Sequence, residues 1–257
     1  MKKPVKIIFS VVLSVAMVLS LALTAYGASS LTFDFTVTVK KGKVFDENGD
    51  LYTGCYIKNR HKYYAESGRR VRGWKKIGKQ YYYFAADYAM AKNKIVGSKK
   101  KGYYYVDKNG IRVTNKEVKQ AVNFVVKNSD PKASSRQRLK QCFKALCKYP
   151  YFGRYYKVSA SKMPSFAKSM FSSKRGDCYY YGAAMAYIAR VLGYESRVAG
   201  GGVTARGAGY PLSEHGWCEV RIGSSWRMID CSMQRAHTNK NLFLVKRSSY
   251  PFRLRYD

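Results

Sequence analysis

The sequence predicts an α+β fold in two unlike parts. Up to about residue 113, strand-like alternation is followed by a short aromatic pattern that repeats, which indicates stacked β-hairpins. From about residue 114, apolar residues recur at helical spacing. The chain has 257 residues, of which 46% are hydrophobic, so it is long enough for two packed domains and too apolar for general disorder.

Residues 1–27 have the pattern of a secretory signal peptide. Lysines occupy positions 2, 3 and 6, an apolar block runs from 7 to 23, and residues 25–27 place small side chains where signal peptidase reads them. The alternative is an uncleaved anchor, which the shortness of the block and its three serines disfavour. We expect cleavage after Gly27, and therefore a secreted protein without an integral membrane span.

The chain is strongly cationic, with 48 Lys and Arg against 15 Asp and Glu and a formal charge of +33. Removing the three lysines of residues 1–27 leaves +30, and both halves of the remainder are basic. Such a surface favours a polyanionic partner. Outside a cell the available polyanions are wall teichoic polymers, acidic polysaccharide and anionic lipid, so we expect anionic cell-wall polymers and not nucleic acid.

Residues 31–39 alternate apolar and polar side chains, which predicts a half-buried strand. Four aromatic or apolar stretches then end in polar turns, at residues 45–49, 64–68, 84–88 and 106–110, spaced about 20 residues apart. A single unit is too short to bury its own aromatic face. The units are therefore expected to stack as a solenoid.

The pattern Tyr-Tyr-Tyr-Phe, polar turn and Gly-Trp resembles the cell-wall-binding repeats of Gram-positive surface proteins, a group that includes choline-binding repeats. In that family, aromatic side chains of successive hairpins form shallow cages that hold a choline head group by cation–π attraction. The resemblance covers about residues 42–113, which with the preceding strand form a predicted domain of residues 28–113, and it implies wall-ligand contacts from Tyr64, Trp74, Tyr83 and Tyr104. The alternative is that the tyrosines form only the packed spine of the stack.

Helices are predicted next. Thr114 with Glu117, and Ser134 with Gln137, have the spacing of capping boxes, and each pair precedes an apolar stripe at helical spacing. A third, short helix is expected at Pro164, since proline suits the first helical turn. The boundary between the two parts is therefore expected just before the first helix.

The most informative segment is residues 175–193, which begins Arg-Gly-Asp-Cys. Asp177 is a good helix cap, a buried apolar stripe follows, and Gly193 fits the helix exit. Cys178 therefore lies in the first turn, where free backbone amides and the helix dipole favour thiolate over thiol. A nucleophilic cysteine needs that state; the alternative is a small, buried structural cysteine.

Residues 215–230 read as a hairpin with a tight turn. Pairing Ile222 with Ser225 would make His215 a same-face diagonal neighbour of Asp230. The two side chains can then meet, which gives an imidazole whose tautomer and charge are fixed by a carboxylate. Taken alone, either residue could instead be an ordinary surface or turn residue.

Gly-Asp-Cys at a helix start, His-Gly-Trp on one strand and Trp-x-x-x-Asp on the next, in this order, resemble the transglutaminase-like superfamily, whose core is papain-like. The resemblance covers about residues 116–257 and implies a catalytic domain in residues 114–257. It implies Cys178 as nucleophile, His215 as general base and acid, and Asp230 as the residue that orients His215. The only oxyanion donor we assign is the backbone amide of Cys178.

Six cysteines in an exported chain would ordinarily suggest disulfides. Cys218 and Cys231 fall on one face of the hairpin, which leaves a bridge between them open. A zinc site made of these cysteines with His215 and His237 is disfavoured, because residues 215 and 218 point to opposite faces of a regular strand. We expect no metal and no cofactor.

Together these inferences describe a secreted, wall-associated cysteine enzyme. It would transfer acyl groups from amides of a protein or peptide substrate through a Cys178 thioester. An amine acceptor would give transglutaminase-type crosslinking, whereas water would give deamidation, or peptide hydrolysis as in a cysteine protease. The sequence leaves all three open. The alternative from another class is a non-catalytic cell-wall adhesin with the same fold.

Overall fold

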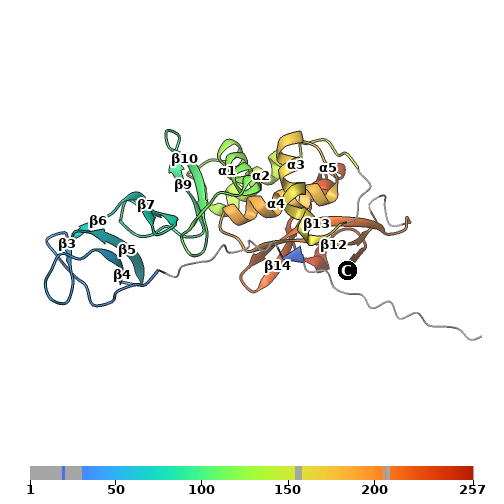
Figure 1. Ribbon diagram of the computed structural model, residues 1–257. Helices are drawn as coiled ribbons and strands as arrows, with labels where there is room; N and C mark the ends of the chain where they lie inside the picture. Colours follow the sequence, from blue (N-terminus) through green and yellow to red (C-terminus); the bar gives the residue numbers. More distant parts are fainter. Residues whose placement is uncertain (1–18, 21–30, 154–157, 205, 207–208, 257) are drawn as a thin grey trace, which may run out of the picture.

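The computed structural model describes residues 19–20, 31–153, 158–204, 206 and 209–256 (Figure 1). The predicted signal peptide lies outside these residues, except for β1 (Leu19–Ser20), which pairs with β12 (Ser196–Val203). Within the described ranges, no helix is long and apolar enough to cross a membrane. The chain forms a row of β-hairpins at one end and helices over a larger sheet at the other.

The hairpin part, residues 38–113, contains three small antiparallel sheets in the orders β2-β3-β6-β5-β4, β7-β8 and β11-β10-β9. This arrangement confirms the predicted β-hairpin repeats. The strands are β2 (Thr38–Lys40), β3 (Lys43–Phe45), β4 (Gly54–Lys58), β5 (His61–Glu66), β6 (Arg69–Arg70), β7 (Gly73–Ile77), β8 (Gln80–Phe84), β9 (Lys94–Ser98), β10 (Gly102–Val106) and β11 (Arg112–Val113).

The prediction of one strand over residues 31–39 is wrong, because regular pairing in this stretch begins only at β2. The carboxylate of Asp34 accepts hydrogen bonds from the backbone N–H of Thr36 at 2.7 Å and from its hydroxyl at 2.8 Å. These local bonds bend the chain and compete with a strand ladder. Phe35, at the bend, is 73% exposed and so does not join the apolar face that its spacing suggested.

The polar turns of the repeat share one backbone conformation. Gly49, Gly68 and Gly110 have positive φ angles of 89°, 72° and 85°, and Tyr88 takes the equivalent place with φ of 68°. This left-handed conformation is strained for a bulky residue. The guanidiniums of Arg70 and Arg72 lie 4.3 and 5.0 Å from the centroid of the Tyr88 ring, and these cation–π contacts offset part of the strain.

In the mixed part, residues 116–256, four helices surround the larger of two apolar clusters that include residues of the main sheet. Helix α4 (Cys178–Val191) packs on β12 and on β13 (Ser213–Ile222), and it is buried almost all round, as a central helix must be. The helices that flank α4 are α1 (Lys116–Asn128), α2 (Ser135–Leu146) and α3 (Met163–Ser173).

The two predicted capping boxes differ in outcome. The Ser134 and Gln137 pair is present and caps α2, as expected. Helix α1 begins at Lys116 with Asn115 as its cap residue, and Asn115 makes no side-chain cap bond. The box expected at Thr114 is therefore wrong, because Asn115 and not Thr114 is the cap residue, so Glu117 falls at the second helical position instead of the third.

The main sheet has the order β1-β12-β13-β14-β15, and β16 (Leu254–Tyr256) also pairs with β12. Strand β14 (Ser225–Ile229) follows β13 through a tight turn, with Ile222 opposite Ser225 as predicted, and β15 (Phe243–Val245) closes the edge. The short elements are η1 (Ala160–Lys162), α5 (Cys231–Ala236) and η2 (Arg247–Ser249).

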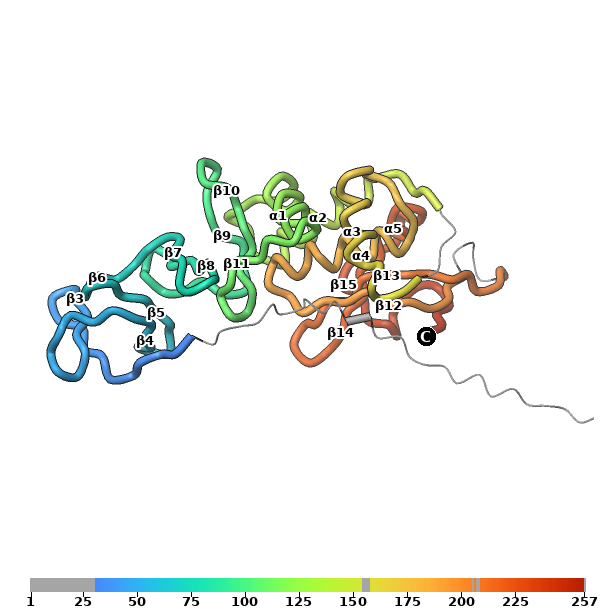
Figure 2. The backbone as a smooth tube through the Cα atoms, in the orientation of Figure 1, coloured from blue at the N-terminus to red at the C-terminus, as the bar shows by residue number. Residues whose placement is uncertain are grey.

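The last hairpin of the repeat is packed against the helices. Figure 2 shows the chain passing from β11 into α1, with β10 beside that helix. Tyr105 of β10 belongs to the same apolar core as α1 and α4, and its hydroxyl donates to the side-chain oxygen of Asn93 at 2.5 Å. The side-chain nitrogen of Asn93 donates in turn to the carbonyl of Gly193 at 2.8 Å, so the two parts are joined by apolar and polar contacts.

Candidate active site

Cys178 is the first residue of α4. The cap residue Asp177 accepts hydrogen bonds from the backbone N–H groups of Tyr179 at 3.0 Å and Tyr180 at 3.4 Å, which fixes the helix start as predicted. The Cys178 side chain therefore lies at the positive end of the helix dipole. The residue is 7% exposed, so its thiol is largely shielded from water.

His215 on β13 and Asp230 at the end of β14 meet, as their register implied. Histidine Nε2 lies 2.7 Å from the carboxylate oxygen Oδ2, and both residues are buried. Burial alone lowers the pKa of His215, but the charge of Asp230 and the hydrogen bonds to Asp230 and Cys178 outweigh it and raise the pKa to about 10. Burial would raise the pKa of Asp230, but the charge of His215 and the hydrogen bonds that Asp230 accepts lower it.

The side chains of Cys178, His215 and Asp230 thus form one continuous series. Asp230 engages Nε2 of His215, and Cys178 lies near enough to His215 for its thiol to contribute to the raised pKa of the imidazole. Since Nε2 already contacts Asp230, Nδ1 is the nitrogen left for proton exchange with the sulfur. A sulfur, an imidazole and a carboxylate in this order can form a thiolate and imidazolium pair and pass a proton between the sulfur and a bound group.

Two glycines allow α4 to approach β13 this closely. A Cβ on Gly216 would lie 2.4 Å from Cδ1 of the Tyr179 ring, and a Cβ on Gly182 would lie 3.1 Å from the backbone carbon of Trp217. The Gly of His-Gly-Trp is therefore required by packing. It brings the helix that carries Cys178 next to the strand that carries His215.

Sequence reasoning missed the other partners of Asp230. Tyr250 donates its hydroxyl to Oδ2 at 2.6 Å, while the Ser232 hydroxyl and the Met233 backbone N–H donate to Oδ1, each at 3.0 Å. The last two bonds exist because Asp230 caps α5, and an Asp followed by a short helical stretch could have indicated this. Tyr250 is 20 residues away on another element, and no local pattern points to it.

Tyr151 is a second missed residue. It lies before the loop that leads to α3, forms a bridge with Gly176, and is half exposed. Burial, followed by the charges of Cys178 and Asp177, raises the pKa of Tyr151 to about 12, so the hydroxyl is protonated near neutral pH.

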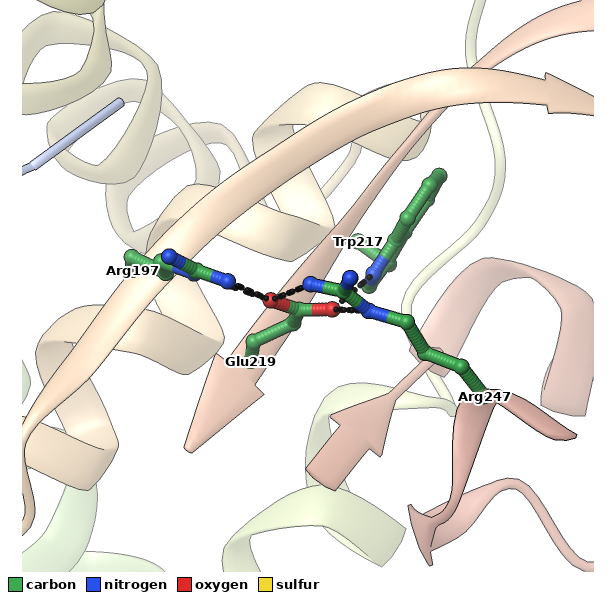
Figure 3. A network of polar contacts seen from close by, with 4 residues as sticks. All are labelled: Arg197, Trp217, Glu219 and Arg247. Atoms are coloured by element: carbon green, nitrogen blue, oxygen red, sulfur yellow. Dashed lines mark hydrogen bonds and ion pairs between the residues drawn. The ribbon is translucent and has the colours of Figure 1, made fainter. Parts of the chain in front are cut away.

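A buried carboxylate behind the site holds the strands together (Figure 3). Glu219 is fully buried and accepts hydrogen bonds from Arg197 at 2.9 Å and from Arg247 at 2.7 and 2.8 Å. It also accepts from Nε1 of Trp217 at 3.3 Å, and the Trp217 ring stacks on His215 with centroids 6.1 Å apart. The network therefore orients a ring that borders the imidazole.

The structure brings together three of the four residues predicted to bind a wall ligand. The Trp74 ring has centroid distances of 5.2 Å to Tyr83 and 5.6 Å to Tyr104, both in edge-on geometry. Tyr64 lies apart from them, in a different apolar cluster with Phe84, 6.2 Å between centroids. Three of the four predicted contacts thus lie in one group of rings, and Tyr64 lies in another cluster.

All six cysteines are free thiols. Cys218 and Cys231, for which the sequence left a disulfide open, are therefore not bridged in this structure. Burial, followed by the neighbouring Cys147 thiol, raises the pKa of the Cys231 thiol. Over the described residues, no group of three or more His, Cys, Asp or Glu side chains could hold a metal ion.

Two family models match the chain. Residues 119–231 match the transglutaminase-like superfamily, a range that includes Cys178, His215 and Asp230, and residues 71–116 match the choline-binding repeat, a range that includes Trp74, Tyr83 and Tyr104. A comparison with curated proteins finds no match.

Several solved structures are similar to parts of the chain. The choline-binding domain of Spr1274 of Streptococcus pneumoniae is 28% identical over 25% of this chain and 97% of its own, with a TM-score of 0.23. Choline-binding protein F of Streptococcus pneumoniae, solved with a peptidoglycan analogue, is 24% identical over 32% of this chain and 27% of its own, with a TM-score of 0.24. The periplasmic domain of TgpA of Pseudomonas aeruginosa is 18% identical over 48% of this chain and 45% of its own, with a TM-score of 0.33. The chain therefore spans less than half the length of the last two.

Proposed function

We propose that this chain is a secreted, wall-associated cysteine enzyme that transfers acyl groups from amides. The proposal is supported by the match of residues 119–231 to the transglutaminase-like superfamily and of residues 71–116 to the choline-binding repeat. The observation that carries this proposal is the alignment of Cys178, His215 and Asp230 in one buried series. A binding scaffold needs none of these contacts. The substrate would be an amide of a protein or peptide.

In the proposed first step, the Cys178 thiolate attacks the amide carbonyl carbon and forms a carbon–sulfur bond, while the carbonyl oxygen takes the negative charge. The tetrahedral species then collapses, the carbon–nitrogen bond breaks, and the imidazolium of His215 gives its proton to the leaving nitrogen. A thioester and a free amine or ammonia result. In the second step, neutral His215 takes a proton from an amine or water, which attacks the thioester and releases the thiolate.

Asp230 would serve this cycle by holding the imidazole in one orientation and stabilising its protonated form. Its remaining lone pairs are engaged by Tyr250, Ser232 and the backbone of Met233, so the carboxylate has little freedom to rotate. The Cys178 backbone N–H would donate to the oxyanion. We assign a second donor to the Tyr151 hydroxyl, because Tyr151 bridges to Gly176, two residues before Cys178, and lies near enough to Cys178 for its charge to raise the Tyr151 pKa.

The hairpin part would attach the enzyme to the bacterial cell wall. This role is supported by the match to a choline-binding repeat and by the positive charge of the whole chain. Wall polymers that carry phosphate or carboxylate groups would attract that charge at long range. Aromatic rings on the hairpins would add contacts at short range.

The test is a reaction of the purified full chain with a library of glutamine peptides and a labelled amine, read by mass spectrometry. We expect crosslinked, deamidated or cleaved products, and their mass identifies the acceptor. Cys178→Ala should lower the rate by roughly a thousandfold or more, whereas Cys142→Ala, at a buried cysteine outside the series, should not. Iodoacetamide at about pH 6 should label Cys178 well ahead of Cys142.

Absence of any product, together with no preferential labelling of Cys178, would overturn the enzyme proposal. The protein would then be a wall adhesin that uses the same fold.

A further inference from the structure

Three aromatic rings of the hairpins, two of them from the group just described, already surround a positive charge of the chain itself. The guanidinium carbon of Arg112, on β11, lies 4.1 Å from the centroid of Tyr81, 5.1 Å from that of Tyr104 and 5.5 Å from that of Trp74. These rings come from three different strands, β8, β10 and β7. We call this arrangement the Arg112 cage: Trp74, Tyr81, Tyr104 and Arg112.

The cage has the features that bind cations to aromatic rings. Each ring centroid is within about 6 Å of the guanidinium, the range in which the ring quadrupole attracts a positive charge. Tyr83 supports the cage from the side by its contact with Trp74, and an apolar floor lies beneath these two rings, made of Ala91, Val96 and Val106.

Arg112 is held by the rings and not by a carboxylate. Over the described residues, the ion pairs are formed by other cations, and none includes Arg112. Its strand position is fixed, because Arg112 pairs with Val106 across β10 and β11. The guanidinium therefore occupies the ring faces that a ligand cation would otherwise use.

We infer that Arg112 is the specificity-determining residue of this cage: it takes the place of a ligand cation and excludes quaternary ammonium groups such as choline. An incoming cation would have to displace the guanidinium of Arg112 from the rings, and it would be repelled by the positive charge of that side chain. This inference rests on the proposed wall-binding role of the hairpin part. It implies that wall attachment uses anionic groups of the polymer and not cationic head groups.

The experiment is a calorimetric titration of the full chain with choline chloride, at constant chloride concentration. The proteins are the unaltered chain, Arg112→Ala, Arg112→Met and the control Arg72→Ala, which removes a cation from the Tyr88 ring and leaves the cage intact. We expect Arg112→Ala to bind choline at least tenfold more tightly than the unaltered chain and the control. Adding Trp74→Ala to Arg112→Ala should abolish the gain, which locates binding in the cage.

Arg112→Met keeps an unbranched apolar stem against the rings, so it provides a folded, uncharged cage if the alanine variant unfolds. Equal choline affinity in the unaltered chain and in both Arg112 variants would overturn the inference, and so would the absence of binding in both variants. Sedimentation with purified walls is measured separately. Failure to sediment, with a choline gain in Arg112→Ala, would overturn the wall-binding role and leave the assignment of Arg112 standing.

Discussion

At Asp230, four donors converge on one buried carboxylate, and this explains why the group stays charged without water. His215 and Tyr250 share one oxygen, while Ser232 and Met233 share the other. A buried carboxylate loses its hydration, and hydrogen bonds to its charged form compensate for that loss. Burial, then the charge of Asp230, raises the pKa of the Tyr250 hydroxyl, so it remains a donor.

The first prediction concerns the pH dependence of stability. Because the pKa of His215 rises from 6.5 to about 10 on folding, its contribution is fully present below about pH 6.5 and is lost as the pH rises through 10. Asp230→Asn should lower the free energy of unfolding near pH 6, by about 3 kcal/mol, since it leaves a buried imidazolium unpaired. It should also flatten the decline between pH 6.5 and 10.

Urea denaturation across this pH range measures both effects. The control is Asp87→Asn, an exposed carboxylate in a hairpin turn, which should keep the slope of the unaltered chain. An unchanged slope in Asp230→Asn would contradict the assignment of a charged pair.

The second prediction concerns Tyr151. If its hydroxyl donates to the oxyanion, Tyr151→Phe should lower kcat about 100-fold with little change in KM, because the bond strengthens only in the transition state. Folding should be intact, since the side chain is half exposed. Single-turnover kinetics measure the effect, and Tyr210→Phe, at another exposed tyrosine, is the control. A rise in kcat would show instead that the hydroxyl blocks the substrate oxygen.

Site residues could be predicted from the sequence where they are close along the chain or face each other across one hairpin. The register of β13 and β14 follows from a short turn, so the contact of His215 with Asp230 could be predicted. Tyr151 and Tyr250 reach the site from segments whose path depends on how the whole domain packs. No local spacing encodes such contacts.

At the level of elements, the site depends on the distance between α4 and β13. Gly216 lies against the Tyr179 ring, whose hydroxyl donates to the Glu214 carboxylate at 3.2 Å. The ring is therefore tied at its far end and has little room to move aside. The helix start and the strand are consequently held in one register.

The third prediction follows from this contact. Gly216→Ala should push α4 away from β13, lengthen the path between Cys178 and His215, and lower kcat/KM at least tenfold, because catalysis depends on this alignment. The free energy of unfolding should fall by about 1 to 3 kcal/mol, as expected for overpacking. Gly209→Ala, where an added Cβ has no atom within 4 Å, is the matched control. Full activity in Gly216→Ala would show that the close approach is not required.

Helices were predicted correctly where an apolar stripe at helical spacing follows a capping residue. The prediction of a strand failed where side-chain hydrogen bonds to the nearby backbone bend the chain. The starts of α2 and α4 follow from Ser134 and Asp177, whose side chains cap them. The strand expected from residue 31 fails because Asp34 bends the chain. Residues 200–202 are three consecutive glycines, a composition typical of loops, yet they belong to β12 because β16 pairs with them there. A Cβ on Gly201 would lie 2.0 Å from the Arg255 carbonyl oxygen, so only glycine permits this approach.

At the level of the whole molecule, the hairpins and the helices share part of one core. Tyr105 is 3% exposed and packs with α1, and Ile95, Tyr103 and Val113 pack against the same cluster. A fragment that ended near residue 113 would expose this apolar surface to water. Wall attachment is therefore best tested on the full chain, with the hairpin part altered by substitution.

The fourth prediction is that wall retention of the full chain depends on salt. The formal net charge is +33, or +30 without residues 1–27, and it attracts a polyanion. The range of this attraction is the screening length, which depends on the salt concentration. Raising salt from about 50 mM to about 1 M shortens the screening length to roughly 3 Å and should release most of the bound protein.

Replacing Lys99, Lys100 and Lys101, which lie exposed at the tip of the β9–β10 hairpin, by alanine should weaken retention at low salt and make the salt dependence shallower. Substituting Tyr64, a predicted wall contact that lies outside the Arg112 cage, should instead weaken retention equally at low and high salt, because a ring contact is screened little. Sedimentation with purified walls, followed by quantitation of the bound fraction at each salt concentration, separates the two contributions. Retention that is independent of salt and of the three lysines would show that charge does not attach the protein.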